Sequence, residues 1–334
     1  MTSTPLKGSG RLTAGPLADG PATSVRPHRP PRSRSRGRGR SAPYWFLLPA
    51  VLLLAAFTVV PVGYALWLSL HKVQVSGIGL GKGARRQVWN GLGNYTAVLH
   101  DSEFGHSVLR AFGYGLIVIP TMLGLALVFA LMLDTPLARS AKFARLAIFL
   151  PYAVPGIIAA LMWGFLYLPT VSPFYYLLRA FDLPQPDLFD GGNLYLSFAN
   201  IAVWGGTGFN MIVIYTALRA IPAEIYEAAR IDGASDLKIA LQIKIPIVLP
   251  SLVLTFFFSV IATLQVFTEP MALRPLTNGL STSWSPLMAI YDVAFRQSDI
   301  YGASATAVVL AVATFVLSFT LLRISDRYTR EDRA

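Results

Sequence analysis

The stretch 221–250, IPAEIYEAARIDGASDLKIALQIKIPIVLP, determines how the whole chain is interpreted. It lies between two long apolar runs, but it is too polar to cross a bilayer and too rich in helix formers to be a linker. Pro222 suits a first helical residue, and Gly233 is a natural helix end. Ser235 can cap a second short helix that runs to Pro246. The stretch therefore predicts a helix-turn-helix.

One face of this helix-turn-helix carries almost no side-chain bulk. Ala228, Ala229 and Gly233 are small, so the backbone of another protein can approach closely. We therefore interpret residues 221–246 as a docking loop on the membrane surface.

The rest of the chain is strongly apolar. Of its 334 residues, 54% are hydrophobic and only 13% are charged, which excludes an ordinary soluble domain. The first apolar run is too long for a signal peptide and no clean cleavage site follows it. Since a helix needs about 20 apolar residues to cross a bilayer, the sequence predicts an all-α polytopic membrane protein with six transmembrane helices, at residues 44–70, 107–133, 143–168, 196–218, 247–269 and 302–322.

Basic residues indicate the orientation of these helices. Most of the 28 Lys and Arg residues fall on one side if both termini share that side, and inner loops are the basic ones. We therefore expect both termini and the loop 221–246 to be cytoplasmic, in a multi-pass protein of the cell inner membrane.

The N-terminal segment 1–43 is basic and rich in Pro, Gly and Ser, with Asp19 as its one acidic residue. Such a composition does not bury enough apolar surface to fold. We expect a disordered cytoplasmic tail that contacts anionic membrane lipid; nucleic-acid binding by its Arg-rich run is the alternative, which we do not favour. The predicted domains are this tail, a six-helix transmembrane domain at 44–323 that contains the loop 221–246, and a C-terminal cytoplasmic tail at 324–334.

Three loops are predicted to be external. The loop 71–106 is too short for a large inserted domain, and the loops 169–195 and 271–301 contain apolar pieces that suit partial helices. The third span begins with Pro151 and Pro155, which free backbone carbonyls and bend a helix.

The docking loop also carries a family resemblance. Glu227-Ala228-Ala229, then Gly233, then Ile243-x-Ile245-Pro246, resembles the EAA loop of permease subunits from binding-protein-dependent ABC importers. Ile245 replaces the usual Leu. An ordinary amphipathic loop is the alternative. In that family the loop is the coupling helix that docks in a groove of the ATPase, so the resemblance implies ATPase contact through Tyr226, Glu227, Ala228, Ala229, Asp232, Gly233 and Ala234.

The resemblance extends over residues 44–323 and is closest to permeases of the maltose, trehalose and glycerol-phosphate type. It implies a sugar importer with a second permease subunit, two ATP-binding subunits and an extracytoplasmic sugar-binding protein. The chain has no Gly-x-x-x-x-Gly-Lys-Ser/Thr motif, so it is not expected to be an enzyme. ATP and Mg²⁺ would be bound by the partner ATPase, and this chain is expected to bind no cofactor.

Two predicted spans carry candidate substrate-pathway residues. A glycine-rich run, 204–210, lets helices pack closely, or leaves room for a sugar beside an aromatic ring. Polar residues within spans suggest function, although Glu269 also suits a solvated position at the outer interface. By the resemblance and by this reasoning, the candidates are Trp204, Gly205, Gly206, Phe209, Ser259, Thr263, Gln265, Val266 and Glu269, with Ala202 and Ala262 beside them.

Two other classes remain as alternatives. An ion-coupled secondary transporter would show repeated halves and buried ionisable residues, and neither is evident in the sequence. A membrane-embedded metal enzyme would have to use His100 and His106 with Asp101 and Glu103, which are more typical of a solvated loop.

Overall fold

The computed structural model describes residues 42–75, 85–135 and 141–331. The chain forms two compact units, residues 1–54 and 55–334, and the division falls inside the first predicted span. The described part of the first unit is one apolar helix, α1 (Ala42–Leu54). Most of the predicted tail 1–43 lies outside the described residues, so its disorder and lipid contact remain predictions.

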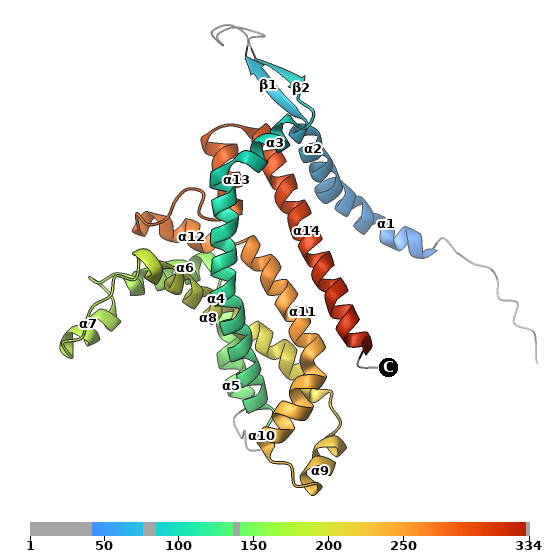
Figure 1. The fold of residues 1–334 in the computed structure, drawn as a ribbon, viewed down its shortest axis with the longest axis vertical. Helices are drawn as coiled ribbons and strands as arrows, with labels where there is room; N and C mark the ends of the chain where they lie inside the picture. Colours follow the sequence, from blue (N-terminus) through green and yellow to red (C-terminus); the bar gives the residue numbers. More distant parts are fainter. Residues whose placement is uncertain (1–41, 76–84, 136–140, 332–334) are drawn as a thin grey trace, which may run out of the picture. The chain divides into compact units, whose positions relative to one another are not determined.

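The second unit is almost entirely helical (Figure 1). Its longest helices pack along one another: α4 contacts α8, α11 contacts both, and α14 packs against α2, α3 and α11. In chain order the elements are η1 (Ala55–Val59), α2 (Val60–Ser69), β1 (His71–Val75), β2 (Arg85–Trp89), α3 (Gly93–His100), α4 (Ser102–Leu133), α5 (Ala141–Phe149), η2 (Leu150–Ala153), α6 (Gly156–Tyr167), α7 (Pro173–Ala180), α8 (Gly191–Arg219), α9 (Ala223–Ile231), α10 (Asp236–Ile239), η3 (Ala240–Lys244), α11 (Ile245–Leu264), α12 (Thr268–Leu273), η4 (Arg274–Leu276), α13 (Pro286–Tyr291), η5 (Asp292–Arg296) and α14 (Ile300–Glu331).

The prediction of an all-α polytopic membrane protein is confirmed. In the described part of the chain, five helices are long and apolar enough to cross a membrane, and a bent pair brings the number to six. The five are Tyr44–Ser69, Ser102–Leu133, Gly191–Arg219, Asp236–Leu276 and Ile300–Thr320.

The third predicted span is the bent pair. Its two parts, Ala141–Ala153 and Gly156–Tyr167, meet at 96°. Val154 lies between them with ψ 126°, because a residue that precedes proline is disfavoured in the helical region, and Pro155 is equally extended. The predicted bend is therefore present, and it is a full break in the helix.

Several boundaries differ from those expected. The second helix of the docking loop does not end at Pro246 but continues through η3 into α11, because Pro246 occupies the first turn of α11, where its missing N–H costs little. Helices α4 and α8 begin about a turn earlier than predicted, and α14 runs to Glu331, through most of the predicted C-terminal tail.

The loops predicted to be external are more ordered than the sequence indicated. Loop 71–106 contains an antiparallel pair, β1 and β2, in register from His71 opposite Trp89 to Val75 opposite Arg85. Asn94 stabilises the start of this pair, because its side-chain amide donates hydrogen bonds to the carbonyl oxygens of both Ser69 and His71. The predicted partial helices of the other two loops are found as α7 and α13.

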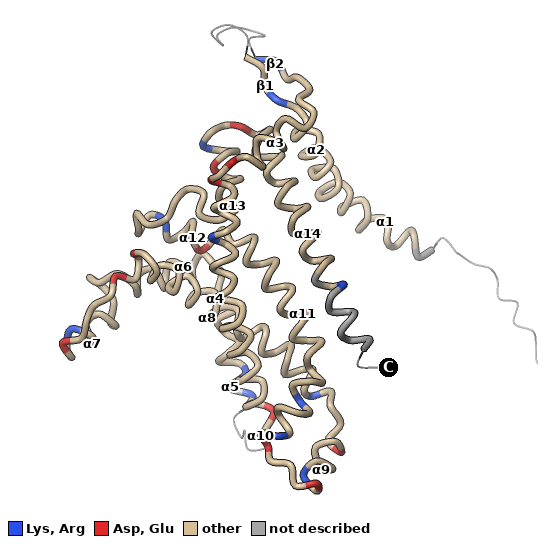
Figure 2. Tube along the Cα trace, in the orientation of Figure 1, with Lys and Arg blue, Asp and Glu red and all other residues tan. Residues whose placement is uncertain are grey.

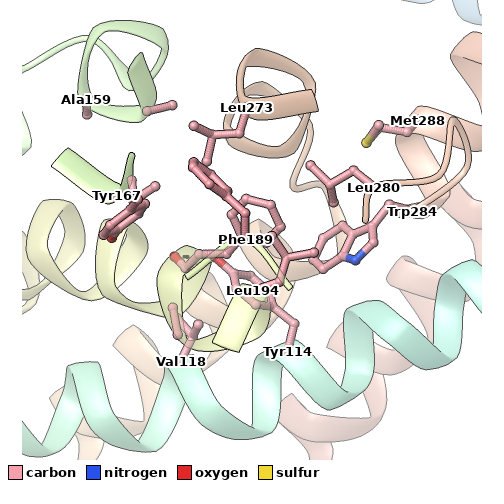
Figure 3. Packing of buried hydrophobic residues seen from close by; sticks show 14 residues of the cluster. Tyr114, Val118, Ala159, Tyr167, Phe189, Leu194, Leu273, Leu280, Trp284 and Met288 are labelled. Atoms are coloured by element: carbon pink, nitrogen blue, oxygen red, sulfur yellow. Dashed lines mark hydrogen bonds between the residues drawn. The ribbon is translucent and has the colours of Figure 1, made fainter. Parts of the chain in front are cut away.

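An aromatic core fixes the relative positions of α4, α6, α8 and α12 (Figure 3). Trp284, from the loop before α13, is nearly buried and meets the rings of Tyr114 and Phe198 edge-on, with centroid distances of 5.7 and 5.3 Å. Edge-to-face packing of this kind adds about 0.5–1.5 kcal/mol per pair beyond area burial. These four helices are therefore held together by buried aromatic side chains.

Candidate functional site

The docking loop is a compact turn between α9 and α10. Pro222 precedes α9 with ψ 140°, so it is the residue before the helix rather than its first residue as expected. At the other end Gly233 has φ +78°, the left-handed conformation that glycine adopts without strain. The amide of Ala234 donates to Ala229 at 2.9 Å and that of Gly233 to Arg230 at 3.0 Å. These two bonds form a Schellman motif, which ends the helix sharply.

Most of the predicted ATPase-contact residues face outward on this turn. Glu227, Ala228, Asp232 and Gly233 are exposed, whereas Tyr226, Ala229 and Ala234 are half-buried. Their neighbours include apolar side chains: Ile231 is 86% exposed and Leu237 is 69% exposed. A small-faced turn flanked by exposed apolar residues is typical of a protein contact surface.

A buried ion pair connects the docking loop to the transmembrane helices. Nζ of Lys244 lies 2.6 Å from Oδ2 of Asp134, which follows α4, and the two side chains are only 12% and 4% exposed. Nζ of Lys244 also lies 5.0 Å from the centre of the Tyr226 ring, a cation–π contact. This link was not predicted from the sequence, because the two charged residues are 110 positions apart.

Tyr226 completes this connection. Burial raises the pKa of its phenol, the charge of Asp134 raises the pKa further, and Arg219 opposes the rise. The hydroxyl is buried without a hydrogen-bond partner among the described residues. Tyr226 therefore contributes a neutral ring, packed against Lys244, to the back of the docking loop.

A second candidate site is a cavity of about 540 Å³ among α4, η2, α6, α8, α11 and α12. The structure brings together around it nearly all the substrate-pathway candidates. It is lined by Ala202, Gly205, Gly206, Phe209, Ser259, Ala262, Thr263, Gln265, Val266 and Glu269.

Trp204 is the one candidate that the structure does not place at the cavity. It packs against the aromatic core, edge-on to Trp163 at a centroid distance of 5.8 Å. Consecutive residues of a helix point about 100° apart, so Gly205 faces the cavity while its neighbour faces the core.

The cavity wall also contains residues that were not predicted from the sequence. Tyr152, from the short helix η2, stacks on Phe209 with a centroid distance of 4.9 Å and an angle of 22°. Tyr114, Met122, Asn210 and Phe258 are among the other lining residues that were missed. Tyr152 lies in the proline-rich segment and Asn210 in the glycine-rich run, which were the available signals.

Hydrogen bonds within single helices hold the polar side chains of the cavity. Ser259 donates to the carbonyl of Thr255 at 2.8 Å, and Thr263 donates to that of Ser259 at 2.8 Å. The amide of Asn210 donates to the carbonyl of Gly206 at 2.9 Å. Glu269 is the only Asp, Glu, Lys, Arg or His in the lining, and among the described residues it forms no ion pair.

The alternative metal site would use His100 and His106 with Asp101 and Glu103. Within residues 42–75, 85–135 and 141–331, no group of three or more His, Asp or Glu side chains is arranged to hold a metal ion. His100 instead pairs with the carbonyl of Thr96 on its own helix.

The fold and these two sites define a polytopic membrane subunit with a surface docking loop and an internal cavity. Residues 90–331 match the family described as the binding-protein-dependent transport system inner membrane component, and the chain belongs to this family. It is therefore a multi-pass transport permease rather than an enzyme. The family supports the ABC importer interpretation and not an ion-coupled transporter.

Curated relatives agree over most of the chain. The sn-glycerol-3-phosphate transport system permease protein UgpA of Escherichia coli O157:H7 is 28% identical over 305 residues, covering 89% of this chain and 98% of that protein. The protein of the same name from Salmonella typhimurium strain LT2 is 27% identical over 301 residues, with the same coverage.

Solved structures agree in fold. A chain of a bacterial ABC transporter involved in the import of the acidic polysaccharide alginate superposes with a TM-score of 0.72 at 18% identity, covering 85% of this chain and 94% of that one. The alginate transporter in complex with alginate pentasaccharide-bound periplasmic protein gives the same TM-score and identity, covering 86% and 94%.

Proposed function

We propose that this chain forms half of the translocation pathway of an ATP-driven carbohydrate importer, and that residues 221–246 couple it to a separate ATPase. The observation that carries the proposal is the Schellman turn at Gly233, which presents Glu227 and Ala228 on an exposed surface. Behind that surface, the buried pair of Lys244 and Asp134 ties the loop to the end of α4. A displacement of the turn by the ATPase would therefore be transmitted through this ion pair to α4.

The proposed assembly follows from what one subunit provides. All the helices that line the cavity belong to this one chain. A second permease subunit would supply the opposite wall of the pathway. Two such subunits would present two docking loops to two ATP-binding subunits. An extracytoplasmic binding protein would deliver the sugar, by analogy with the alginate transporter and its pentasaccharide-bound periplasmic protein.

The proposed topology places both termini and the docking loop in the cytoplasm. The charge pattern of the whole sequence supports it, because the tail 1–43 and the loops predicted to be cytoplasmic together carry most of the 28 Lys and Arg residues. In the described part of the chain, Lys and Arg lie at both ends of the long helices, and α5, α9 and α10 are among the segments that carry them (Figure 2). Cytoplasmic placement of α9 and α10 is what contact with a cytoplasmic ATPase requires.

The proposal is tested by charge reversal on the docking loop. Glu227 is exposed and forms no ion pair in the described part of the chain, so Glu227→Lys changes the surface without breaking an internal bond. We expect the tagged chain to reach the membrane at normal yield and to lose its co-purifying ATP-hydrolysing subunit. The bulky Gly233→Trp should have the same effect.

A matched control is the same charge reversal on the side predicted to be external. Asp190 is exposed and makes no capping bond to α8, so Asp190→Lys should leave the ATPase bound. Retention of the ATPase at normal yield by both docking-loop variants would contradict the proposal.

A further inference from the structure

The lining of the cavity is mainly apolar, with a few polar side chains and almost no charged ones. Its 23 residues include one carboxylate, that of Glu269, and none of the described residues in the lining is Lys, Arg or His. From this composition we propose that this chain's half of the pathway selects for an uncharged, hydroxyl-rich solute and against anionic solutes. The inference rests on the proposed function, in which the cavity lies on the pathway.

Ser259, Thr263 and Asn210 offer acceptor atoms to a solute, while Tyr152, Gln265 and Thr268 in the same lining can also donate. Ser259 and Thr263 each donate their single hydroxyl proton to a backbone carbonyl, so their oxygen lone pairs remain available to a solute. Asn210 likewise donates one amide proton to a backbone carbonyl, and its side-chain carbonyl oxygen can accept a hydrogen bond from a solute. A sugar hydroxyl can donate to these acceptors, whereas a carboxylate or phosphate group brings only further acceptors.

Glu269 adds a fixed negative charge to this lining. A Cβ placed on Gly156 would lie 3.6 Å from Oε1 of Glu269, so the carboxylate sits beside the first turn of α6. None of the described residues in the lining is basic, so the carboxylate has no basic partner in the cavity.

The apolar part of the lining suits the flat face of a sugar ring. The stacked rings of Tyr152 and Phe209 form one wall, and Gly205 leaves open space beside them, since nothing lies within 4 Å of a Cβ built there. Aromatic faces pack against the C–H face of a sugar while its hydroxyls seek polar partners.

The matched relatives make this inference specific. One is named for glycerol-3-phosphate and a solved transporter for an acidic polysaccharide, and both of these substrates are anions. The lining described above would repel such solutes, so we infer that the cargo of this chain differs in charge from theirs.

The absence of cysteine from the sequence allows a direct test. Gly205→Cys places one thiol in the cavity, and the assembled importer is treated with cationic, neutral and anionic methanethiosulfonates of similar size. Rates are expressed relative to the neutral reagent, which cancels any change in thiol ionisation. We expect the cationic reagent to react at least about tenfold faster than the anionic one, as one nearby charge at the effective dielectric of a protein interior predicts.

Two substitutions assign the effect to its source. Adding Glu269→Gln should bring the ratio close to one, and Glu269→Lys should invert it. As a matched control, Gly192 lies in the first turn of α8 outside the lining and also has open space at its Cβ, so the ratio measured for Gly192→Cys should not respond to Glu269 variants.

The outcomes separate the two proposals. Equal or faster reaction with the anionic reagent in Gly205→Cys overturns the charge selection while leaving the pathway accessible. No reaction with any reagent, with and without ATP, shows that water does not reach the cavity. That result overturns the proposed pathway together with the inference.

Discussion

The docking loop and the cavity use charge in opposite ways. Around the loop, Lys244 and Asp134 form a buried pair and Arg230 pairs with Asp236 on the surface. The cavity contains one carboxylate and otherwise neutral groups. Figure 2 shows the same contrast along the second unit, with charged residues around α5, α9 and α10 and uncharged stretches in the long helices.

The difference reflects the function proposed for each region: the docking loop has to keep two elements at a fixed distance, and the cavity has to let a solute pass. A buried ion pair fixes two elements at one distance, because neither charge tolerates separation in a poorly solvated place. A solute pathway requires the reverse, since a strong local interaction would trap the passing molecule. The comparison therefore predicts that substitutions at the loop end affect rigidity, and those at the cavity affect which solute passes.

The largest expected effect is at the buried pair. Asp134→Asn or Lys244→Met leaves one buried charge without a partner, which should lower the free energy of unfolding by about 3–5 kcal/mol. The measurement is thermal unfolding of the purified chain in detergent. The double variant Asp134→Asn/Lys244→Met should recover most of the loss, because it leaves no unpaired charge.

The exposed pair of the same region is the control. Arg230→Gln breaks a bridge of 3.4 Å between side chains that are 51% and 77% exposed, and such pairs contribute about 0–1 kcal/mol. Equal destabilisation by Arg230→Gln and Lys244→Met would show that burial does not distinguish the two pairs.

The second prediction concerns two glycines on α8, three residues apart. A Cβ at Gly208 would collide with the backbone of Ile148 and Phe149, whereas a Cβ at Gly205 meets nothing within 4 Å. Gly208→Ala should therefore cost about 1–3 kcal/mol, and Gly205→Ala should be neutral or slightly stabilising. Thermal unfolding of the two variants in parallel checks this. A larger loss of stability for Gly205→Ala than for Gly208→Ala would contradict the close contact of α5 with α8.

Much of this arrangement followed from the sequence. Five spans appear where apolar length placed them, and the turn at Gly233 ends a helix as expected. The bend between α5 and α6 was expected from Pro151 and Pro155, but its 96° was not, because proline removes a helical bond without setting the new direction.

Other features depend on contacts that no local pattern records. Asp134 and Lys244 are 110 positions apart in the sequence. Their pairing becomes visible only in the structure, where the end of α4 lies beside η3. The misplacement of Trp204 has a related cause. The apolar residues of α8 are spread around the helix, so no polar stripe distinguishes its cavity face from its core face, and the sequence made Trp204 and Gly205 equal candidates.

The third prediction tests the turn itself. Gly233→Ala forces a Cβ into a left-handed conformation at φ +78°, which costs about 1–2 kcal/mol. We expect weaker co-purification of the ATPase and normal membrane yield, since nothing else surrounds the position. Gly124→Ala, in a regular helix with equally open space, should leave ATPase binding unchanged, and a similar loss there would show that the effect is not specific to the turn.

The smallest expected effect is a pH dependence at η5, outside the docking loop and the membrane-spanning helices. Burial opposes ionisation of Asp292, but hydrogen bonds from Gln297 and Thr282 and the charge of Arg296 outweigh it, so the pKa lies below its ordinary value. A depressed carboxyl pKa stabilises the fold above the pKa of the unfolded chain, and this stabilisation is lost as the pH falls through the folded pKa.

Asp292→Asn should therefore lower the unfolding temperature slightly at neutral pH and reduce the loss of stability on acidification. The measurement is the midpoint of thermal unfolding from neutral pH down to about pH 2, because the ordinary aspartate pKa is about 3.9 and the pKa of Asp292 lies below it. Asp182, an exposed aspartate with no ion pair among the described residues, provides the comparison, and Asp182→Asn should leave the acid dependence as it is in the natural chain. Identical acid profiles for Asp292→Asn and the natural chain would mean that the bonds around η5 contribute no stability.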